Sequence, residues 1–141
     1  MKEPVWLQRE FVLVLHERMV AAFGGLAGVR DEGMLESALG RPQYQFAYER
    51  PSHFGLAAAY AFGITRNHPF LDGNKRTGLI AAATFLERNG YSFCATEAEA
   101  TAATLALAEG TLTEAAFAAW LGDHTTKAKQ KTPKKGPVAR L

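Results

Sequence analysis

Residues 53–67 constrain the fold of this chain more than any other stretch, because apolar side chains occupy nearly all of its positions. Ser52 stands just before this stretch and is typical of a residue that begins a helix. Pro69 follows it and does not allow a helix to continue unbroken. The apolar run Phe54–Ile64 is well short of the roughly 18 residues that a membrane span needs. A helix that is apolar on all sides is buried, so we predict a central helix here.

The flanking segments combine helical spacing of apolar residues with the usual signals for helix ends. In Leu7–Phe23 the apolar residues fall on one helical face, and glycines follow. Gly40–Pro42 is predicted to end the second helix. Strand signals are few, so we predict an all-α fold, compact and built from six to seven helices. Beside 53–67, helices are predicted over residues 7–23, 31–39 with Asp31 as N-cap, 75–89, 96–109 with Thr96 and Glu99 as a capping box, and 113–121 with Thr113 as N-cap.

Residues 43–50 depart from the helical pattern. Tyr44, Phe46 and Tyr48 occupy every second position, and a proline bounds the segment on either side. Alternation of this kind is typical of extended backbone. We predict a short strand or extended flap, with an aromatic loop packed on the core as the alternative.

The densest group of chemically active side chains follows the central helix, in the sequence HPFLDGNKRT of residues 68–77. An apolar helical pattern resumes directly afterwards, so a helix begins near Asn74 or Lys75. The first amides of a helix have no acceptor within it and the helix dipole is positive there, which makes a phosphate site. Gly73 permits a turn with positive φ, and Arg76 adds a second cation beside Lys75.

His68 and Asp72 add a base and a carboxylate to this cationic segment. The carboxylate of Asp72 repels an anion unless a cation lies between them, and Mg²⁺ typically binds one or two carboxylates together with phosphate oxygens. His68 is then placed to take a proton from an attacking hydroxyl. The alternative is an ordinary loop before a solvated helix start, but Lys75 and Arg76 oppose the dipole there and are poor choices for stability alone.

The sequence HPFLDGNKR of residues 68–76 resembles the signature of the Fic/Doc superfamily, roughly H-x-F-x-[D/E]-[A/G]-N-[G/K]-R. Lys75 resembles the death-on-curing (Doc) branch, the toxins of type II toxin–antitoxin systems, rather than the branch that transfers AMP. The resemblance covers about residues 5–124 and implies the compact helical Fic fold, with residues 43–50 as a flap that docks a target. Further segments resemble Doc toxins at matching places, namely residues 24–28, 31–41, 47–49 and 85–90.

Two residues separate the expected chemistry from AMP transfer. Fic proteins that transfer AMP usually have Gly after the motif Asn and a second Arg three residues beyond the first, whereas this chain has Lys75 and Leu79. The Doc pattern implies a nucleotide bound in reverse and a protein kinase that moves the γ-phosphate of ATP to a Ser or Thr hydroxyl of elongation factor Tu, which arrests translation. It implies a Phd-type antitoxin as partner, whose helix lies in a groove near the active site.

The resemblance also implies a role for each site residue. His68 is the base and Asp72 holds Mg²⁺, while Gly73, Asn74, Lys75 and Arg76 bind the phosphates of ATP. Two alternatives stay open. One is an AMP or other nucleotidyl transferase that tolerates Lys75, and the other is a non-enzymatic helical binding module whose loop captures an anion.

Charge divides the chain into two parts. Residues 125–141 hold six of the 16 basic residues and no acidic one, so ten basic residues face 14 acidic ones in residues 1–124, giving +6 and −4. We predict one Fic/Doc domain over residues 1–124 and a basic, disordered tail over 125–141. Weak contact of the tail with nucleic acid is the alternative. The lone Cys94 excludes an internal disulfide, and residues 1–10 show no signal pattern, so a cytoplasmic protein without membrane contact is expected.

Overall fold

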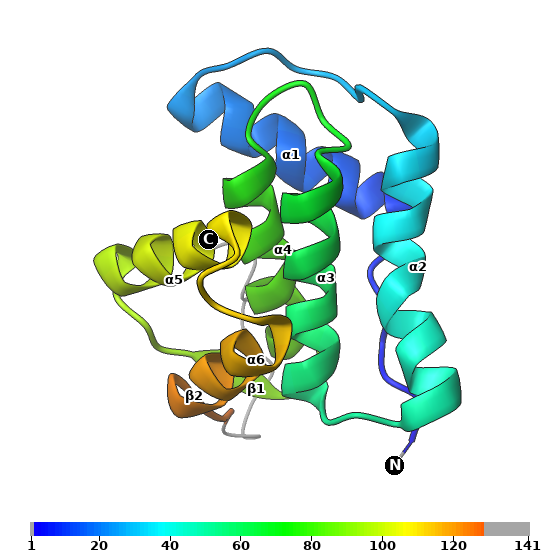
Figure 1. The fold of residues 1–141 in the computed structure, drawn as a ribbon, viewed down its shortest axis with the longest axis vertical. Helices are drawn as coiled ribbons and strands as arrows, with labels where there is room; N and C mark the ends of the chain where they lie inside the picture. The colour runs from blue at the N-terminus through cyan, green and yellow to red at the C-terminus, as the bar shows by residue number, and fades with distance from the viewer. Residues whose placement is uncertain (1, 129–141) are drawn as a thin grey trace.

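The computed structural model describes residues 2–128, which form six α-helices and a sheet of two strands (Figure 1). The predicted all-α fold class is confirmed. In this part of the chain no helix combines the length and the apolar character needed to cross a bilayer. The elements are α1 (Arg9–Phe23), α2 (Glu32–Glu49), α3 (His53–Asn67), α4 (Asn74–Arg88), β1 (Tyr91–Phe93), α5 (Glu97–Glu109), α6 (Glu114–Asp123) and β2 (Thr125–Lys127).

Helix α3 is the buried centre of the fold, with the bounds predicted for it. It lies between α2 and α4, and α6 packs against it as well (Figure 1). Small residues bring its neighbours close. A Cβ at Gly63 would lie 3.1 Å from the Cα of Ala38 on α2, and a Cβ at Gly78 of α4 would lie 2.9 Å from Cγ2 of Thr65. Close backbone packing therefore holds α3 against α2 and α4 against α3.

Four helix N-termini carry the side-chain caps that their residue types predict. Each cap oxygen accepts a hydrogen bond from an amide in the first turn, which satisfies one of the free donors. Thr96 and Glu99 complete the predicted capping box reciprocally. The caps are Asp31 to Met34 N (3.0 Å), Ser52 to Gly55 N (3.2 Å), Thr96 to Glu99 N (3.1 Å) and Thr113 to Ala116 N (3.0 Å).

The prediction that residues 40–42 end the second helix and that residues 43–50 form an extended flap is wrong. Helix α2 continues through Pro42 to Glu49. Pro42 lacks the amide hydrogen that an interior position uses, which normally costs about 3 kcal/mol. Pro42 and Phe46 are, however, both buried on the core face of this helix, and Phe46 packs edge-on against Trp6 at 5.7 Å. Tertiary packing of this face overrides the local signal to stop.

The alternating aromatic residues are explained by the same helix. Tyr44 and Tyr48 lie one turn apart on its exposed face, where their rings stack with centroids 5.4 Å apart. On the inner side, Arg41 and Gln45 both donate to the carboxylate of Glu114 at the start of α6, with the shortest Arg41 contact at 2.5 Å. The period of two was thus a coincidence of two helical faces.

The described fold continues a few residues past the predicted domain boundary at residue 124. Thr125–Lys127 forms β2 and pairs antiparallel with β1, and the amide of Ala128 donates to Gly90 O at 2.9 Å. This pairing joins residues far apart in the sequence, so composition gave no sign of it. The rest of the predicted tail, residues 129–141, lies outside the described residues.

Candidate active site

His68 lies at the C-terminus of α3 with its backbone in the left-handed region, at φ 50° and ψ 55°. Positive φ is uncommon for a residue with a side chain, so neighbouring contacts must hold it. Arg30 supplies them, because its Nε donates to His68 O at 2.7 Å and its Nη2 donates to Asn67 O at 2.9 Å. A cation at a helix C-terminus also complements the dipole. The side chain of His68 is exposed, as a base that meets a substrate must be.

The motif loop, residues 68–73, is paired with the α1–α2 loop, residues 24–31. These two connections run side by side at one end of the molecule (Figure 1). An antiparallel bridge joins Val29 to Phe70. Backbone hydrogen bonds extend it, from Leu71 N to Gly28 O (3.0 Å), from Arg30 N to Pro69 O (2.6 Å) and from Asp31 N to Pro69 O (3.1 Å).

Phe70 and Asn74 hold the motif loop against the core and to the start of α4. Phe70 is 1% exposed and anchors the loop in the core. The side chain of Asn74 accepts from Phe70 N at 2.9 Å and donates to Phe70 O at 3.0 Å, so both polar groups of its amide bind the loop backbone. In this arrangement the Asn74 side chain holds the loop, and within the described residues its backbone amide has no protein acceptor.

The N-terminus of α4 is open. Gly73 is its N-cap residue, with φ 76° and ψ 19°, and provides no side-chain cap. The first amide bonded back is that of Thr77, to Gly73 O at 3.0 Å, and within residues 2–128 the amides of residues 74–76 have no protein acceptor. Lys75 and Arg76 are exposed in the same turn, which contains no acidic residue. Free amides, the helix dipole and two cations are the features that favour an anion at a helix start.

Asp72 lies between His68 and the start of α4, and both its side chain and its backbone oxygen have hydrogen-bond partners. Its carboxylate Oδ2 accepts from Leu26 N at 2.7 Å, and its backbone oxygen lies 2.8 Å from His16 Nε2. The side chain is exposed. The described residues contain no group of three His, Cys, Asp or Glu side chains that would hold a metal by themselves.

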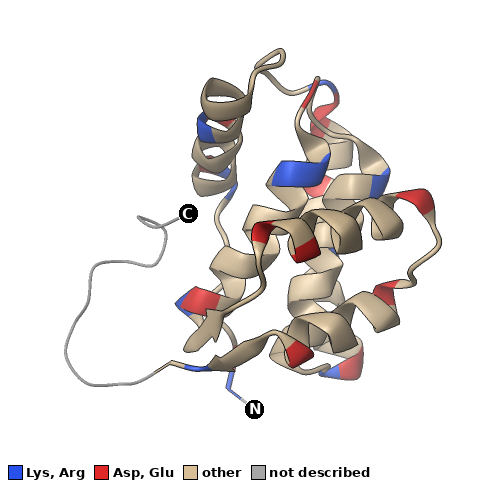
Figure 2. Cartoon of the chain, turned by 90° about the vertical axis from the view of Figure 1, so that its left-hand side faces the viewer, with Lys and Arg blue, Asp and Glu red and all other residues tan. Residues whose placement is uncertain are grey.

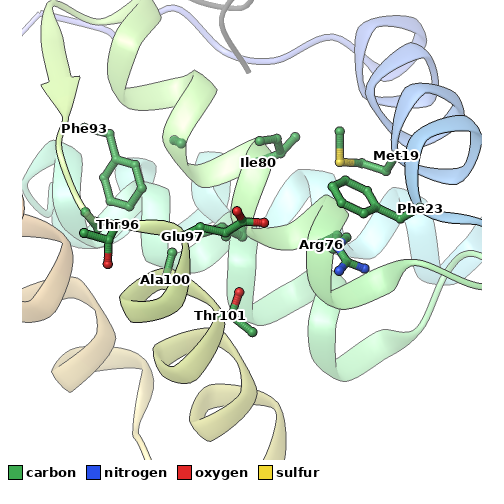
Figure 3. Close-up of a pocket in the computed structure, with 12 residues that line it drawn as sticks. Met19, Phe23, Arg76, Ile80, Phe93, Thr96, Glu97, Ala100 and Thr101 are labelled. Atoms are coloured by element: carbon green, nitrogen blue, oxygen red, sulfur yellow. The ribbon is translucent and has the colours of Figure 1, made fainter.

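A groove of about 450 Å³ opens beside Arg76, between α1, α4 and α5 (Figure 3). The guanidinium of Arg76 rests on the ring of Phe23, 3.9 Å from its centroid, a cation–π contact that holds Arg76 at the end of the groove. A smaller hollow of about 170 Å³ adjoins Lys75 and Arg76 on the α5 side. The groove is lined mainly by apolar side chains, among them Met19, Phe23, Leu79, Ile80, Ala83 and Phe93.

The structure therefore connects the predicted base and the predicted phosphate residues through one short, fully braced loop. The sequence did not indicate the residues that brace it. His16, Arg30 and Leu26 all lie outside the motif. They lie 56, 38 and 46 residues from their partners, and no local pattern reports a contact over such a separation.

A family model described as the Fic/DOC family matches residues 6–86, which include the complete motif loop and most of α4. The chain belongs to the Fic/DOC family. Two relatives within the family are similar to this chain. The chain is 42% identical over 82 residues to a protein kinase Doc of Escherichia phage P1, a match that spans 57% of this chain and 65% of the relative. It is 44% identical over 94 residues to a toxin Doc of Mycolicibacterium smegmatis (strain ATCC 700084 / mc(2)155), spanning 64% and 68%.

The chain thus spans about two thirds of the length of these relatives. The family match includes α1, the α1–α2 loop and the motif loop, so the contacts of His16 and Arg30 lie wholly within the matched region. The contacts that hold the motif loop are therefore part of the Fic/DOC domain of this chain.

Proposed function

We propose that this chain is a Doc-type toxin of a type II toxin–antitoxin system, a protein kinase that transfers the γ-phosphate of ATP to a Ser or Thr hydroxyl of a translation factor. The observation that carries the proposal is the open N-terminus of α4, with left-handed Gly73 and the cations Lys75 and Arg76. One short loop, hydrogen-bonded to the α1–α2 loop, joins it to an exposed His68. The two relatives, a protein kinase and a toxin, support the same activity.

In the proposed reaction, His68 takes the proton of the target hydroxyl, and the hydroxyl oxygen forms a bond to the γ-phosphorus. The bond from that phosphorus to the β–γ bridging oxygen breaks, and ADP leaves with the electron pair. Lys75, Arg76 and the free amides of α4 stabilise the negative charge on the transferred group. Asn74 keeps the loop closed through Phe70 so that these donors stay in place.

Transfer of the γ-phosphate is favoured over transfer of AMP by two side chains. Lys75 fills the space that a Gly leaves beside a phosphate and adds its own charge. Leu79 lines the apolar groove and has no group to bind an outer phosphate. The family pattern for AMP transfer needs a Gly and an Arg at these two positions.

Mg²⁺ fits Asp72. The carboxylate is exposed and uses Oδ2 on Leu26 N, which leaves Oδ1 for a cation. A site with one protein carboxylate suits this ion, because Mg²⁺ usually takes its other ligands from phosphate oxygens and water. When bound, it would neutralise charge on the phosphates of ATP.

The proposed partners follow from the groove and from the charge pattern. A Phd-type antitoxin would place the apolar face of a helix in the groove beside Arg76, whose lining is mainly apolar. Elongation factor Tu is the target implied by the Doc resemblance, and an activity on it belongs in the cytoplasm. Basic and acidic residues are interspersed over the side shown in Figure 2, so we do not propose nucleic acid as a partner of the described domain.

Labelled ATP tests the function. Purified protein is incubated with a bacterial lysate and with ATP labelled at either the α- or the γ-phosphate, beside a His68→Ala variant. We expect one protein to acquire the γ label, and no transfer by the variant. Transfer of the α label alone would contradict the kinase and favour AMP transfer. Transfer of neither label, with anion binding intact, would favour the binding module.

A further inference from the structure

A buried histidine from α1 reaches the motif loop. His16 is 2% exposed, and its ring stacks on Phe70 with centroids 3.9 Å apart and planes 9° from parallel. Its Nε2 lies 2.8 Å from the backbone oxygen of Asp72. A carbonyl oxygen can only accept, so Nε2 carries the proton and donates it. Building on the proposed phosphate site, we infer that His16 is a positioning residue that turns the Gly73 amide toward the phosphate.

The planarity of the peptide transmits this effect. No cis peptide bond occurs in the described chain, and in a trans peptide the carbonyl oxygen and the amide hydrogen point in opposite directions. Because the Asp72 oxygen points at the buried ring of His16, the Gly73 N–H points away from α1. Within the described part of the chain this N–H has no protein acceptor. Together with the free amides of Asn74 and Lys75 it forms a concave set of donors, a nest for an anion.

The conformation of Gly73 explains why the peptide needs an external hold. At φ 76° a residue with a side chain would be strained, and glycine is not. The same freedom would let the Asp72–Gly73 peptide rotate, which would turn the Asp72 oxygen outward and place the negative end of a dipole against the phosphate. His16 opposes this rotation with a donor fixed by burial and by stacking on Phe70. The Cα of Gly73 also packs against α1, since a Cβ there would lie 3.7 Å from His16 Nε2 and 3.8 Å from Val20.

Three variants separate positioning from simple packing. His16→Gln keeps a side-chain N–H that reaches the Asp72 oxygen. His16→Leu fills the space under Phe70 but donates nothing. Val12→Ala is the matched control, because Val12 is 0% exposed one turn away on the same helix and its truncation lowers stability without removing a hydrogen bond to the loop.

The first measurement needs no ligand. In isotope-labelled protein, NMR of the parent should show the His16 ring protonated at Nε2. A ring protonated at Nδ1 alone would overturn the inference even if no variant folds. The amide resonance of Gly73 should move in His16→Leu and stay near its parent position in His16→Gln and Val12→Ala. A Gly73 resonance unchanged in His16→Leu would also overturn it.

The second measurement titrates inorganic phosphate into the same four proteins. We expect phosphate to move the Gly73 amide in the parent, and its affinity to fall by about tenfold to a hundredfold in His16→Leu, as for the loss of one charge-assisted hydrogen bond. His16→Gln and Val12→Ala should bind within a few-fold of the parent. Equal affinity in His16→Leu and Val12→Ala would overturn the positioning role. If phosphate leaves Gly73 unmoved in the parent while the ligand-free results hold, the proposed phosphate site is wrong and the hold of His16 on the peptide stands.

Discussion

The N-termini of α4 and α6 are built from opposite kinds of residues. Helix α6 begins with Thr113, whose hydroxyl accepts from Ala116 N at 3.0 Å, and with the acidic Glu114 in its first turn. Helix α4 begins with Gly73, has no side-chain cap, and carries Lys75 and Arg76 in its first turn. The first arrangement satisfies an amide and complements the dipole, while the second leaves amides free and opposes it.

From this difference we infer that the start of α6 serves stability and the start of α4 serves a ligand. A cap and a favourable charge each contribute up to about 1 kcal/mol, and α4 has neither. The fold compensates from elsewhere, since Asn74 and Arg30 hold the loop before α4 through side chains. If α4 is built to bind phosphate, changes at its start should alter activity, and changes at the start of α6 should alter only stability.

The largest expected effect lies at the base. His68→Ala should lower the rate of phosphoryl transfer by ~10²–10⁴-fold, because the target hydroxyl then has no group to take its proton. The side chain is exposed, so the melting temperature and helical circular dichroism should match the parent. A variant that stays as active as the parent would remove His68 from the mechanism.

Lys75→Glu should change activity and stability in opposite directions, which distinguishes a ligand-binding helix start from a stabilising one. Reversing this charge should lower the rate of phosphoryl transfer by about tenfold or more, because the phosphate loses an attractive cation and meets a repelling anion. The free energy of unfolding should rise by about 0.3–1 kcal/mol, because an acidic residue complements the start of a helix. Denaturant unfolding and initial rates measure the two effects. A loss of both activity and stability would mean that Lys75 supports the fold.

Asp72→Asn should produce a smaller, conditional loss. The amide oxygen of Asn can still accept from Leu26 N, so the loop should keep its shape, but the carboxylate for Mg²⁺ is gone. Activity should then require more Mg²⁺ to reach its plateau. Asp31→Asn is the control, since Asp31 also accepts from a backbone amide, at 3.0 Å, and lies outside the proposed site. Identical Mg²⁺ curves for parent and Asp72→Asn would limit Asp72 to its bond with Leu26.

The smallest effect on activity is expected at the other helix end. Thr113→Ala should lower the free energy of unfolding by about 1 kcal/mol, the usual cost of losing an N-cap. Phosphoryl transfer should be unchanged at a temperature where the variant is folded. A clear loss of activity in this folded variant would show that the ends of α4 and α6 are not functionally distinct.

Local signals predicted the parts of this fold that local interactions decide. Ser52 and Thr96 indicated helix starts that the structure confirms, and the apolar stretch over residues 53–67 gave the central helix with its bounds. Pro42 misled, because the burial of Phe46 one turn later keeps the helix going. Propensity describes a residue alone, whereas this segment is decided by what it packs against.

The site divides in the same way. The residues that we propose to meet the substrate lie within one short motif, so their types and spacing were enough to predict an anion site at the start of a helix. The residues that hold the motif come from α1 and the α1–α2 loop. The bonds of His16 and Arg30 exist only after the chain has folded, over separations of 56 and 38 residues. The motif alone therefore predicts a chemistry, but it does not indicate the residues that hold the loop.

A titration with Mg-ATP shows whether the start of α4 binds phosphate. Isotope-labelled protein is mixed with increasing Mg-ATP, and NMR follows the amides of Gly73, Asn74 and Lys75 at the start of α4 beside those of Ala115 and Ala116 at the start of α6. If the start of α4 binds the phosphates of ATP, saturable shifts should appear at α4 and none at α6, where Thr113 already occupies the Ala116 amide. Shifts of similar size at both helix ends, or none at α4, would contradict it.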